Sequence, residues 1–288
     1  PDLKKPITFT EYTEQEVENG ATPQANFRLT SPIISKLNES NLEKWVFGNF
    51  GINAKKVICA NPTPAQLKEY GIDKPTSTLE MKYNKTSTFT LTTGKGINCT
   101  HKDGEDLTNH QHKIASYYVY KKESNLVYEI PVENLNWLEL KADAVISKIA
   151  VLPNILDIKD VELSLDGKTP EKIEFILGKN PEDATEITVN VNGKPVDAQK
   201  GKSFLQLIEF TAIQKISETP SNGKVSVSIK YNYRNGKSDL VEVTTEKDAS
   251  SKIILNKNSY FLGRMGFANA IKQQFQNLIS GKNVDTEW

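Results

Sequence analysis

The order of hydrophobic and polar positions is similar in the two halves of the chain. Each half has a segment with helical spacing, then four segments with strand-like alternation, then a closing helical segment. One alternating segment also has a similar sequence in both halves: Leu79-Glu-Met-Lys-Tyr-Asn84 and Val227-Ser-Ile-Lys-Tyr-Asn232. We therefore expect an α+β fold of two repeats, each a mainly antiparallel sheet with flanking helices in the order helix, four strands, helix.

Helical spacing is most specific where start and stop residues accompany it. Thr63 and Gln66 have the spacing of a capping box, Pro64 suits the first helical position, and Gly71 suits a left-handed exit. The segments that we expect to be helical are 40–51, 63–71, 131–140, 203–217 and 267–281.

Alternation with a period of two predicts the strands. Asp166-Gly167, Asn192-Gly193 and Asn235-Gly236 are dipeptides typical of tight hairpin turns. We expect strands near 27–30, 79–83, 89–91, 116–120, 126–130, 161–165, 173–177, 187–191, 225–231, 239–245, 251–255 and 259–262. A boundary within 147–157 then separates a lead-in segment 1–26 and a first repeat 27–150 from a second repeat 151–288.

The charge composition narrows the classes of partner. The 288 residues have a formal net charge of zero, and the basic residues are nearly all lysine, with arginine only at Arg28, Arg234 and Arg264. Because arginine is best suited to bidentate phosphate contacts, we expect no nucleic-acid partner. No apolar run reaches membrane-spanning length. The chain begins at Pro1, which is compatible with a natural product that begins earlier and carries a signal or an anchor.

One polar loop holds most of the metal-binding chemistry. Cys99, His101, His110 and His112 lie within residues 99–112, and thiolate and imidazole are the usual ligands of zinc. Their spacing matches no common zinc framework, so a solvated hairpin loop is the alternative interpretation. We expect no cofactor unless zinc binds here. Cys59 and Cys99 form either a disulfide or two unrelated thiols, and the sequence leaves both open.

Tyrosines gather in the adjacent predicted strands 116–120 and 126–130. Tyr117 and Tyr120 are candidate ligand-binding residues, because aromatic rings can stack on a base or a sugar. Cross-strand packing is the alternative interpretation. The chain also has no Gly-x-Ser-x-Gly motif and no phosphate-binding loop, and its three histidines share one loop. We therefore expect that the protein is not an enzyme.

Several segments resemble one bacterial family. Leu67-Lys-Glu-Tyr-Gly-Ile-Asp-Lys-Pro75 resembles the pattern Leu-x-x-Tyr-Gly-Leu-x-x-Pro of proteins that contain domain of unknown function 4340. Tyr117-Tyr-Val119 and Leu126-Val-Tyr-Glu-Ile130 resemble the next two strands of that family. Val189-Asn-Val-Asn-Gly-Lys194 and the helix around Phe204–Phe210 resemble the matching segment of its second repeat. The resemblance covers most of the chain from about residue 27, and the 99–112 loop is similar to an insertion.

The resemblance implies a cell-envelope protein, held to the membrane by an N-terminal anchor outside these residues, with an association with ABC-type transport or gliding-type systems. It transfers no catalytic residues. Our first hypothesis is a non-enzymatic, extracytoplasmic, membrane-anchored module that binds an envelope or transporter protein. The alternatives are a solute- or glycan-binding protein with its ligand between the domains near Tyr117 and Tyr120, and metal binding through the 99–112 loop.

Overall fold

The computed structural model describes residues 5–15, 27–38, 48, 51–83, 87–99, 114–209, 213–217, 219–246 and 250–287. The chain forms two compact units. The first unit comprises residues 1–2 and 39–141, and the second comprises residues 3–38 together with residues 142–288. Residues 27–38 thus belong with residues 142–288, whereas the domain ranges 1–26, 27–150 and 151–288 stay a prediction.

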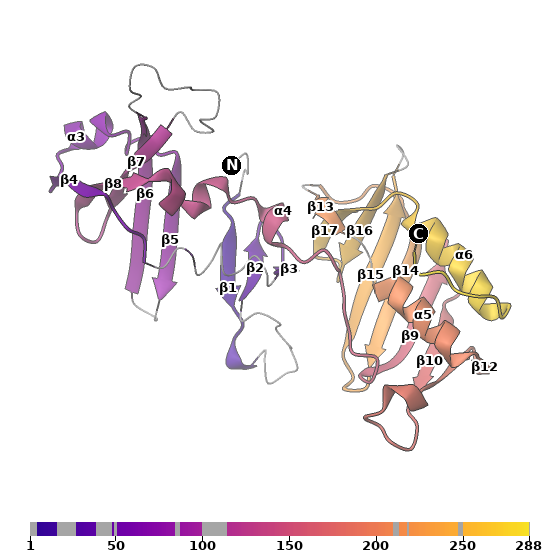
Figure 1. The fold of residues 1–288 in the computed structure, drawn as a ribbon. Coiled ribbons are helices and arrows are strands. Elements are labelled where there is room, and N and C mark those ends of the chain that lie inside the picture. Colours follow the sequence, from indigo (N-terminus) through magenta and orange to yellow (C-terminus); the bar gives the residue numbers. More distant parts are fainter. Residues whose placement is uncertain are drawn as a thin grey trace, which may run out of the picture. The chain divides into compact units, whose positions relative to one another are not determined.

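The first unit contains a five-stranded antiparallel sheet with the strand order β4-β8-β7-β6-β5 (Figure 1). The strands are β4 (Lys56–Ala60), β5 (Ser77–Tyr83), β6 (Ser87–Asn98), β7 (Ile114–Lys121) and β8 (Leu126–Pro131). The helical elements are α3 (Pro64–Glu69) and the 3-10 turns η3 (Val132–Asn134) and η4 (Asn136–Glu139). Strands β5 to β8 form a meander, and β4 lies beside β8.

One face of this sheet forms the core of the first unit. Its buried side chains are Leu91, Val119, Ile130, Leu135 and Trp137. Each contributes on the order of 2 kcal/mol by leaving water. Trp137 comes from η4, and its Nε1 donates a hydrogen bond of 3.0 Å to Ser77 Oγ, so the indole N–H is satisfied.

Helix α3 lies on the opposite face of the same sheet. It begins at the predicted capping box, in which Thr63 Oγ1 accepts from the Gln66 backbone N–H and the Gln66 side chain accepts from the Thr63 N–H. The ring of Tyr70 lies 4.8 Å, centroid to centroid, from that of Tyr118. Because successive strand residues alternate between faces, Tyr118 points away from its buried neighbour Val119.

Two glycines bring the end of α3 against β6. Gly71 has a φ of +75°, which L side chains rarely adopt. Lys95 N donates to Tyr70 O at 2.8 Å, and a Cβ added to Gly94 would lie 2.2 Å from that same carbonyl oxygen. The segment Leu67–Pro75 is therefore a structural contact between helix and sheet.

The second unit contains two antiparallel sheets. A small sheet has the order β1-β2-β3, and a nine-stranded sheet has the order β12-β11-β10-β9-β14-β15-β16-β17-β13. The strands of the small sheet are β1 (Thr8–Glu11), β2 (Phe27–Ser31) and β3 (Ser35–Lys36). Those of the large sheet are β9 (Ile158–Leu165), β10 (Glu171–Ile176), β11 (Thr188–Val191), β12 (Lys194–Val196), β13 (Ile213–Ile216), β14 (Lys224–Tyr233), β15 (Ser238–Thr245), β16 (Ser251–Leu255) and β17 (Ser259–Gly263).

Two helices cover one face of the nine-stranded sheet, which we call the inner face (Figure 1). They are α5 (Ala198–Glu209) and α6 (Phe267–Ile279), and the unit also contains α4 (Ala142–Val145) and η5 (Ala184–Glu186). The rings of Phe204 and Phe275 pack between α5 and α6 with centroids 5.7 Å apart. The side chains of Val161, Ile173 and Ile229 on this face are at most 1% exposed. The other side is the outer face.

Both edges of the nine-stranded sheet are protected. Edge strand β12 is three residues long and contains Lys194 and Pro195. At the opposite edge, Ile213 N of β13 donates to Lys148 O at 2.9 Å, and Ile216 N donates to Asp143 Oδ1 at 2.6 Å. Two backbone N–H groups of this edge strand are thus already used.

The expected α+β fold of two repeats, each with the order helix, four strands, helix, is wrong. The described part of the chain is mostly β, with three antiparallel sheets. Residues 132–134 and 136–139 of the predicted helix 131–140 form the short turns η3 and η4, although the leucines there have helical spacing. Residues 213–216 of the predicted helix 203–217 form strand β13. The predicted helix 40–51 falls almost entirely outside the described residues.

The similar Lys-Tyr segments also occupy different places. Val227–Asn232 lies in β14, a strand with neighbours on both sides, whereas Leu79–Tyr83 lies in the edge strand β5. Both segments alternate between hydrophobic and polar residues because strands of antiparallel sheets generally do so. Among the described helices, none combines the length and the apolar character needed to cross a bilayer.

Candidate functional site

The structure does not bring Tyr117 and Tyr120 to one face. Both lie in β7, three positions apart, and alternation therefore directs their rings to opposite sides of the sheet. Tyr117 packs against the core of the first unit. Tyr120 OH donates to Asn125 Oδ1 at 2.9 Å on the other side. The two rings therefore do not form a shared stacking platform, and ligand binding by either stays a prediction.

The predicted metal ligands fall mainly outside the described residues. His101, His110 and His112 lie within 100–113, where the structure describes nothing. Cys99 follows β6 and is a half-buried thiol, as is Cys59 on β4. Strands β8 and β7 lie between β4 and β6, so strand spacing alone puts the two thiols at least about 14 Å apart, too far for a disulfide, and both cysteines are free. Within the described part of the chain, no group of three or more acidic, histidine or cysteine side chains could hold a metal ion.

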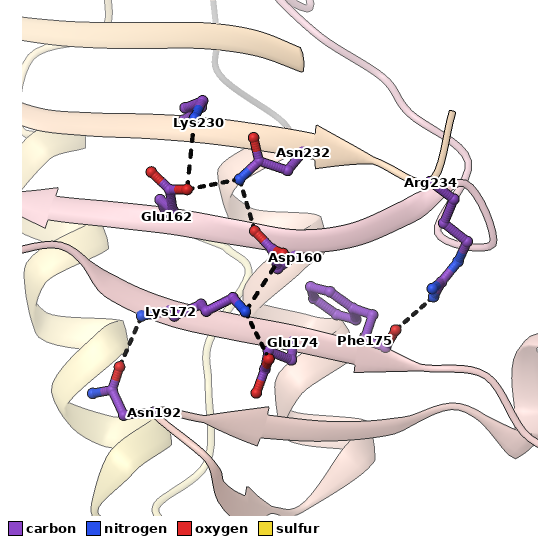
Figure 2. Close-up of polar contacts among 9 residues, drawn as sticks. All are labelled: Asp160, Glu162, Lys172, Glu174, Phe175, Asn192, Lys230, Asn232 and Arg234. Carbon is purple, nitrogen blue, oxygen red and sulfur yellow. Dashed lines mark hydrogen bonds and ion pairs between the residues drawn. The ribbon is translucent and has the colours of Figure 1, made fainter. Parts of the chain in front are cut away.

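A different cluster lies on the outer face of the nine-stranded sheet. Alternation sends the apolar residues of β9, β10 and β14 inward and their polar residues outward. Register places Asp160 between Glu174 and Asn232, and Glu162 between Lys172 and Lys230. We call this group the polar strip. Its members are Asp160, Glu162, Lys172, Glu174, Lys230 and Asn232 (Figure 2).

Asp160 is the centre of the polar strip. Its side chain is only 6% exposed, and its Oδ1 accepts a hydrogen bond of 2.7 Å from Asn232 Nδ2. Asn232 Nδ2 also donates to Glu162 Oε1 at 2.9 Å, so one amide joins both carboxylates of β9. A carboxylate this far from water is retained because it is paired and hydrogen-bonded.

Two lysines complete the polar strip (Figure 2). Lys172 Nζ lies 2.8 Å from Glu174 Oε1 and 3.7 Å from Asp160 Oδ2. These carboxylates, Glu174 first, raise the pKa of Lys172, against the opposing effect of burial. Lys230 Nζ lies 3.6 Å from Glu162 Oε1. The lysine side chains stay 46% and 43% exposed, so the strip offers charged groups to solvent while neighbouring side chains fix their positions.

Backbone contacts hold both ends of the polar strip in place. Lys172 N donates to Asn192 Oδ1 at 2.8 Å, which ties β10 to the turn before β12. At the other end the Arg234 guanidinium donates to the carbonyls of Leu156 and Phe175. The strip is therefore carried by a rigid part of the sheet.

Replacing Asp160 tests the internal pairing of the polar strip. We expect Asp160→Ala to lower the free energy of unfolding by about 1–3 kcal/mol, because Lys172 and Asn232 lose a buried acceptor. Urea denaturation measures the change. Glu182→Ala, at an exposed position of the same unit, should change stability by less than about 0.5 kcal/mol. Equal effects of the two variants would contradict a central role for Asp160.

The first unit has its own buried carboxylate. The side chain of Glu129 on β8 is 7% exposed, and its Oε1 accepts from Lys55 Nζ and from Ser116 Oγ, both at 3.0 Å. Lys56 Nζ lies 3.3 Å from Oε2. The hydrogen bond from Lys55 is the main cause that lowers the pKa of Glu129, while burial opposes it. This group is a structural ion pair that ties β4 to β8.

Acid titration should reveal the Glu129 pair. Because the pKa of Glu129 is lower in the folded protein than its ordinary 4.5, its stabilising contribution is present above about pH 4.5 and is lost as the pH falls through the folded value. We expect Glu129→Gln to lower stability at neutral pH and to weaken the loss on acidification, measured by denaturation between about pH 2 and pH 7. Glu133→Gln, at an exposed position, should leave the acid profile unchanged.

The polar strip was not predicted as a site. In the sequence, the members of the strip form three pairs of polar residues, and the two residues of a pair are two positions apart. The pairs stand at 160 and 162, at 172 and 174, and at 230 and 232. Only the strand order, which places β14 beside β9, brings the third pair to the other two.

These features define the class of the protein. It is an antiparallel β protein of two units that carries a cluster of polar side chains on one sheet face of the second. The model of the family described as Domain of unknown function (DUF4340) matches residues 28–225, and the chain belongs to that family. The family resemblance predicted from the sequence is thereby confirmed. A comparison with curated proteins finds no match.

Proposed function

We propose that the chain is a non-enzymatic protein-binding module that works outside the cytoplasm, is anchored to the membrane and serves an envelope or ABC-type transport assembly. The observation that carries the binding role is the polar strip on the outer face of the nine-stranded sheet. The location, the anchor and the transport assembly rest on what the family resemblance implies, and the strip does not bear on them.

The shape and charge of the polar strip favour a protein partner. Sites for small solutes are usually concave, whereas the strip lies across three neighbouring strands of a sheet face. Its three carboxylates outnumber its two lysines, which disfavours the phosphates of a nucleic acid. A partner surface with amides and basic side chains would complement it.

The pairing of the carboxylates favours binding over catalysis. Asp160, Glu162 and Glu174 each have a lysine or amide neighbour within the polar strip. A general base needs a carboxylate directed at a substrate proton. The carboxylates of the strip instead share Lys172 and Asn232 as partners, so their positions are fixed before a partner protein binds. Fixed side chains lose less conformational entropy on association.

Site-specific photocrosslinking tests the binding role. We would place a photoreactive residue at Ser228, beside the polar strip on the outer face of β14, in the full-length protein in its native cells. Gln273, exposed on α6, is the control position. We expect one discrete adduct from Ser228 that the double charge reversal Glu162→Lys and Glu174→Lys, at the two partly exposed carboxylates of the strip, reduces about tenfold or more.

The fold of each variant is checked by far-ultraviolet circular dichroism. A charge reversal at exposed Lys237 should leave the adduct unchanged. If the adduct survives reversal of Glu162 and Glu174, or if Gln273 gives the same adduct, the polar strip is not the binding face. Absence of any adduct from Ser228 in cells that contain the whole assembly would also refute the proposal.

The location has a separate test. Spheroplasts treated with an amine reagent that cannot cross the membrane should label the lysines of this chain without lysis, because thirty-six basic residues, mostly lysine, are spread along it. Labelling that appears only after lysis would refute the extracytoplasmic location and leave the binding role standing.

A further inference from the structure

Strand β5 forms one edge of the five-stranded sheet of the first unit. It pairs with β6 over seven consecutive residues without a break in register, and the strand order ends with it. The strand at the opposite edge, β4, has five residues and an irregular register between Val57 and Cys59. Because a long and regular edge offers a row of backbone groups to a further strand, β5 is the edge of this sheet that is best suited to pair with another chain.

Alternate residues of β5 direct their backbone groups away from the sheet. Thr90 of β6 is the register partner of Glu80, but its carbonyl accepts from Lys122 N, which follows β7, at 3.2 Å. Glu80 and Thr90 therefore form a non-hydrogen-bonded pair, and the N–H and C=O of Glu80 point outward. By alternation, those of Thr78 and Lys82 point outward as well. Within the described part of the chain, no backbone hydrogen bond uses these outward groups.

The two faces of β5 differ in character. Leu79 packs against the core of the first unit, and Met81, on the same face by alternation, is half-buried. The side chains of Glu80 and Lys82 on the opposite face are 53% and 75% exposed, and Lys82 Nζ lies 3.3 Å from Glu80 Oε1. A strand added at this edge would therefore extend the core on one face and meet two charges of opposite sign on the other.

We propose that β5 is the interface of a homodimer, in which the β5 strands of two copies pair antiparallel about a two-fold axis at Met81. Glu80 of each copy then lies opposite Lys82 of the other copy, and the two residues exchange hydrogen bonds through their outward backbone groups. The same pairing sets each exposed charge beside an opposite one. Leu79 and Met81 of both copies lie on one face of the joined sheet, so the two cores become continuous. Because the same strand serves both copies, the association closes at a dimer.

Charge selects this register and favours a second copy as the occupant of the edge. Positions 80 and 82 are equally distant from position 81, so an axis at Met81 pairs glutamate with lysine on both sides. An axis at Glu80 instead sets two glutamates opposite each other, and an axis at Lys82 sets two lysines opposite each other, and both arrangements are destabilising. A single pair of strands buries a small area, so the dimer should be weak and reversible. The pairing depends on no property of the polar strip.

Sedimentation equilibrium of the full chain tests the dimer. We expect dimers at about 1 mM that largely dissociate at about 10 µM. Glu80→Lys and Lys82→Glu each set like charges opposite one another, so each variant alone should dimerise about tenfold or more weakly. An equimolar mixture of the two variants should regain the affinity of the unmodified chain, because each lysine then meets a glutamate. Glu182→Lys, at an exposed position of the second unit, should leave dimerisation unchanged. A chain that stays monomeric at about 1 mM, or a mixture as weak as its components, overturns the proposal.

Disulfide crosslinking tests the register. The variants also carry Cys59→Ser and Cys99→Ser, so that one thiol remains in each chain. Met81→Cys places the two thiols across the axis at a non-hydrogen-bonded pair, where a Cα separation of about 4.5 Å permits a disulfide. Leu79→Cys is the control, because residue 79 lies opposite residue 83 of the other copy. We expect mild oxidation to link the chains through position 81 alone. Links that are absent at position 81, or as frequent at position 79, overturn the proposal.

Discussion

Gly94→Ala should destabilise the first unit by about 3 kcal/mol or more. A Cβ at this position would meet Tyr70 O at 2.2 Å, and that oxygen already accepts from Lys95 N at 2.8 Å. The clash is with backbone, so no side-chain rotation can relieve it. Urea denaturation followed by the fluorescence of the buried Trp137 would measure the loss.

Gly96→Ala is the matched control on the same strand. Its added Cβ would meet only side-chain atoms of Ile114, at 2.7 Å from Cδ1, and a side chain can move. We expect a cost of about 1–2 kcal/mol for this variant. Equal costs at both glycines would show that the contact between the end of α3 and β6 is not the constraint that the geometry indicates.

Phe275→Ala should cost about 3–5 kcal/mol in the second unit. Its ring is 1% exposed and packs against Phe204 of α5 at 5.7 Å between centroids, so truncation leaves a cavity between the two helices and the inner face. Denaturation followed by far-ultraviolet circular dichroism would measure the effect, because this unit holds the larger sheet.

The neighbouring Gln276→Ala is the control for this variant. Gln276 is exposed on α6, so its truncation should change stability by less than about 0.5 kcal/mol. If Phe275→Ala were as mild, the helices would contribute little to the inner face, and the distinction between a covered face and an open outer face would lose its energetic basis.

Local signals predicted local structure well. The capping box at Thr63 and Gln66 is present, and α6 spans Phe267–Ile279 within the predicted 267–281. Asn192 and Gly193 both have positive φ, as a two-residue hairpin turn requires. These features depend on neighbours within a few residues, so a pattern along the chain is enough to specify them.

The pattern of hydrophobic and polar residues could not predict which distant strands pair. Nothing in the alternation of 161–165 or 225–231 indicates that β9 pairs with β14 across the whole of α5, yet this pairing merges all the strands after residue 157 into one sheet. The expected pair of repeats failed for this reason. The spacing of Leu135 and Leu138 likewise suggested a helix, although tertiary contacts select short 3-10 turns there.

The same limit applies to the candidate sites. Alternation alone separates Tyr117 from Tyr120, and that conclusion was available from their spacing of three residues. The polar strip could not be assembled in this way, because Asn232 reaches Asp160 only through the pairing of β14 with β9. A site formed by several strands becomes visible only when the strand order is known.

The protected margins of the nine-stranded sheet affect how copies of the protein associate at high concentration. A strand of another copy cannot extend the sheet at Pro195, which has no N–H to offer, nor at Ile213 and Ile216, whose N–H groups are occupied. Large open sheets risk polymerising into fibres through such margins. Copies held at high density should therefore not join through these two margins of the nine-stranded sheet.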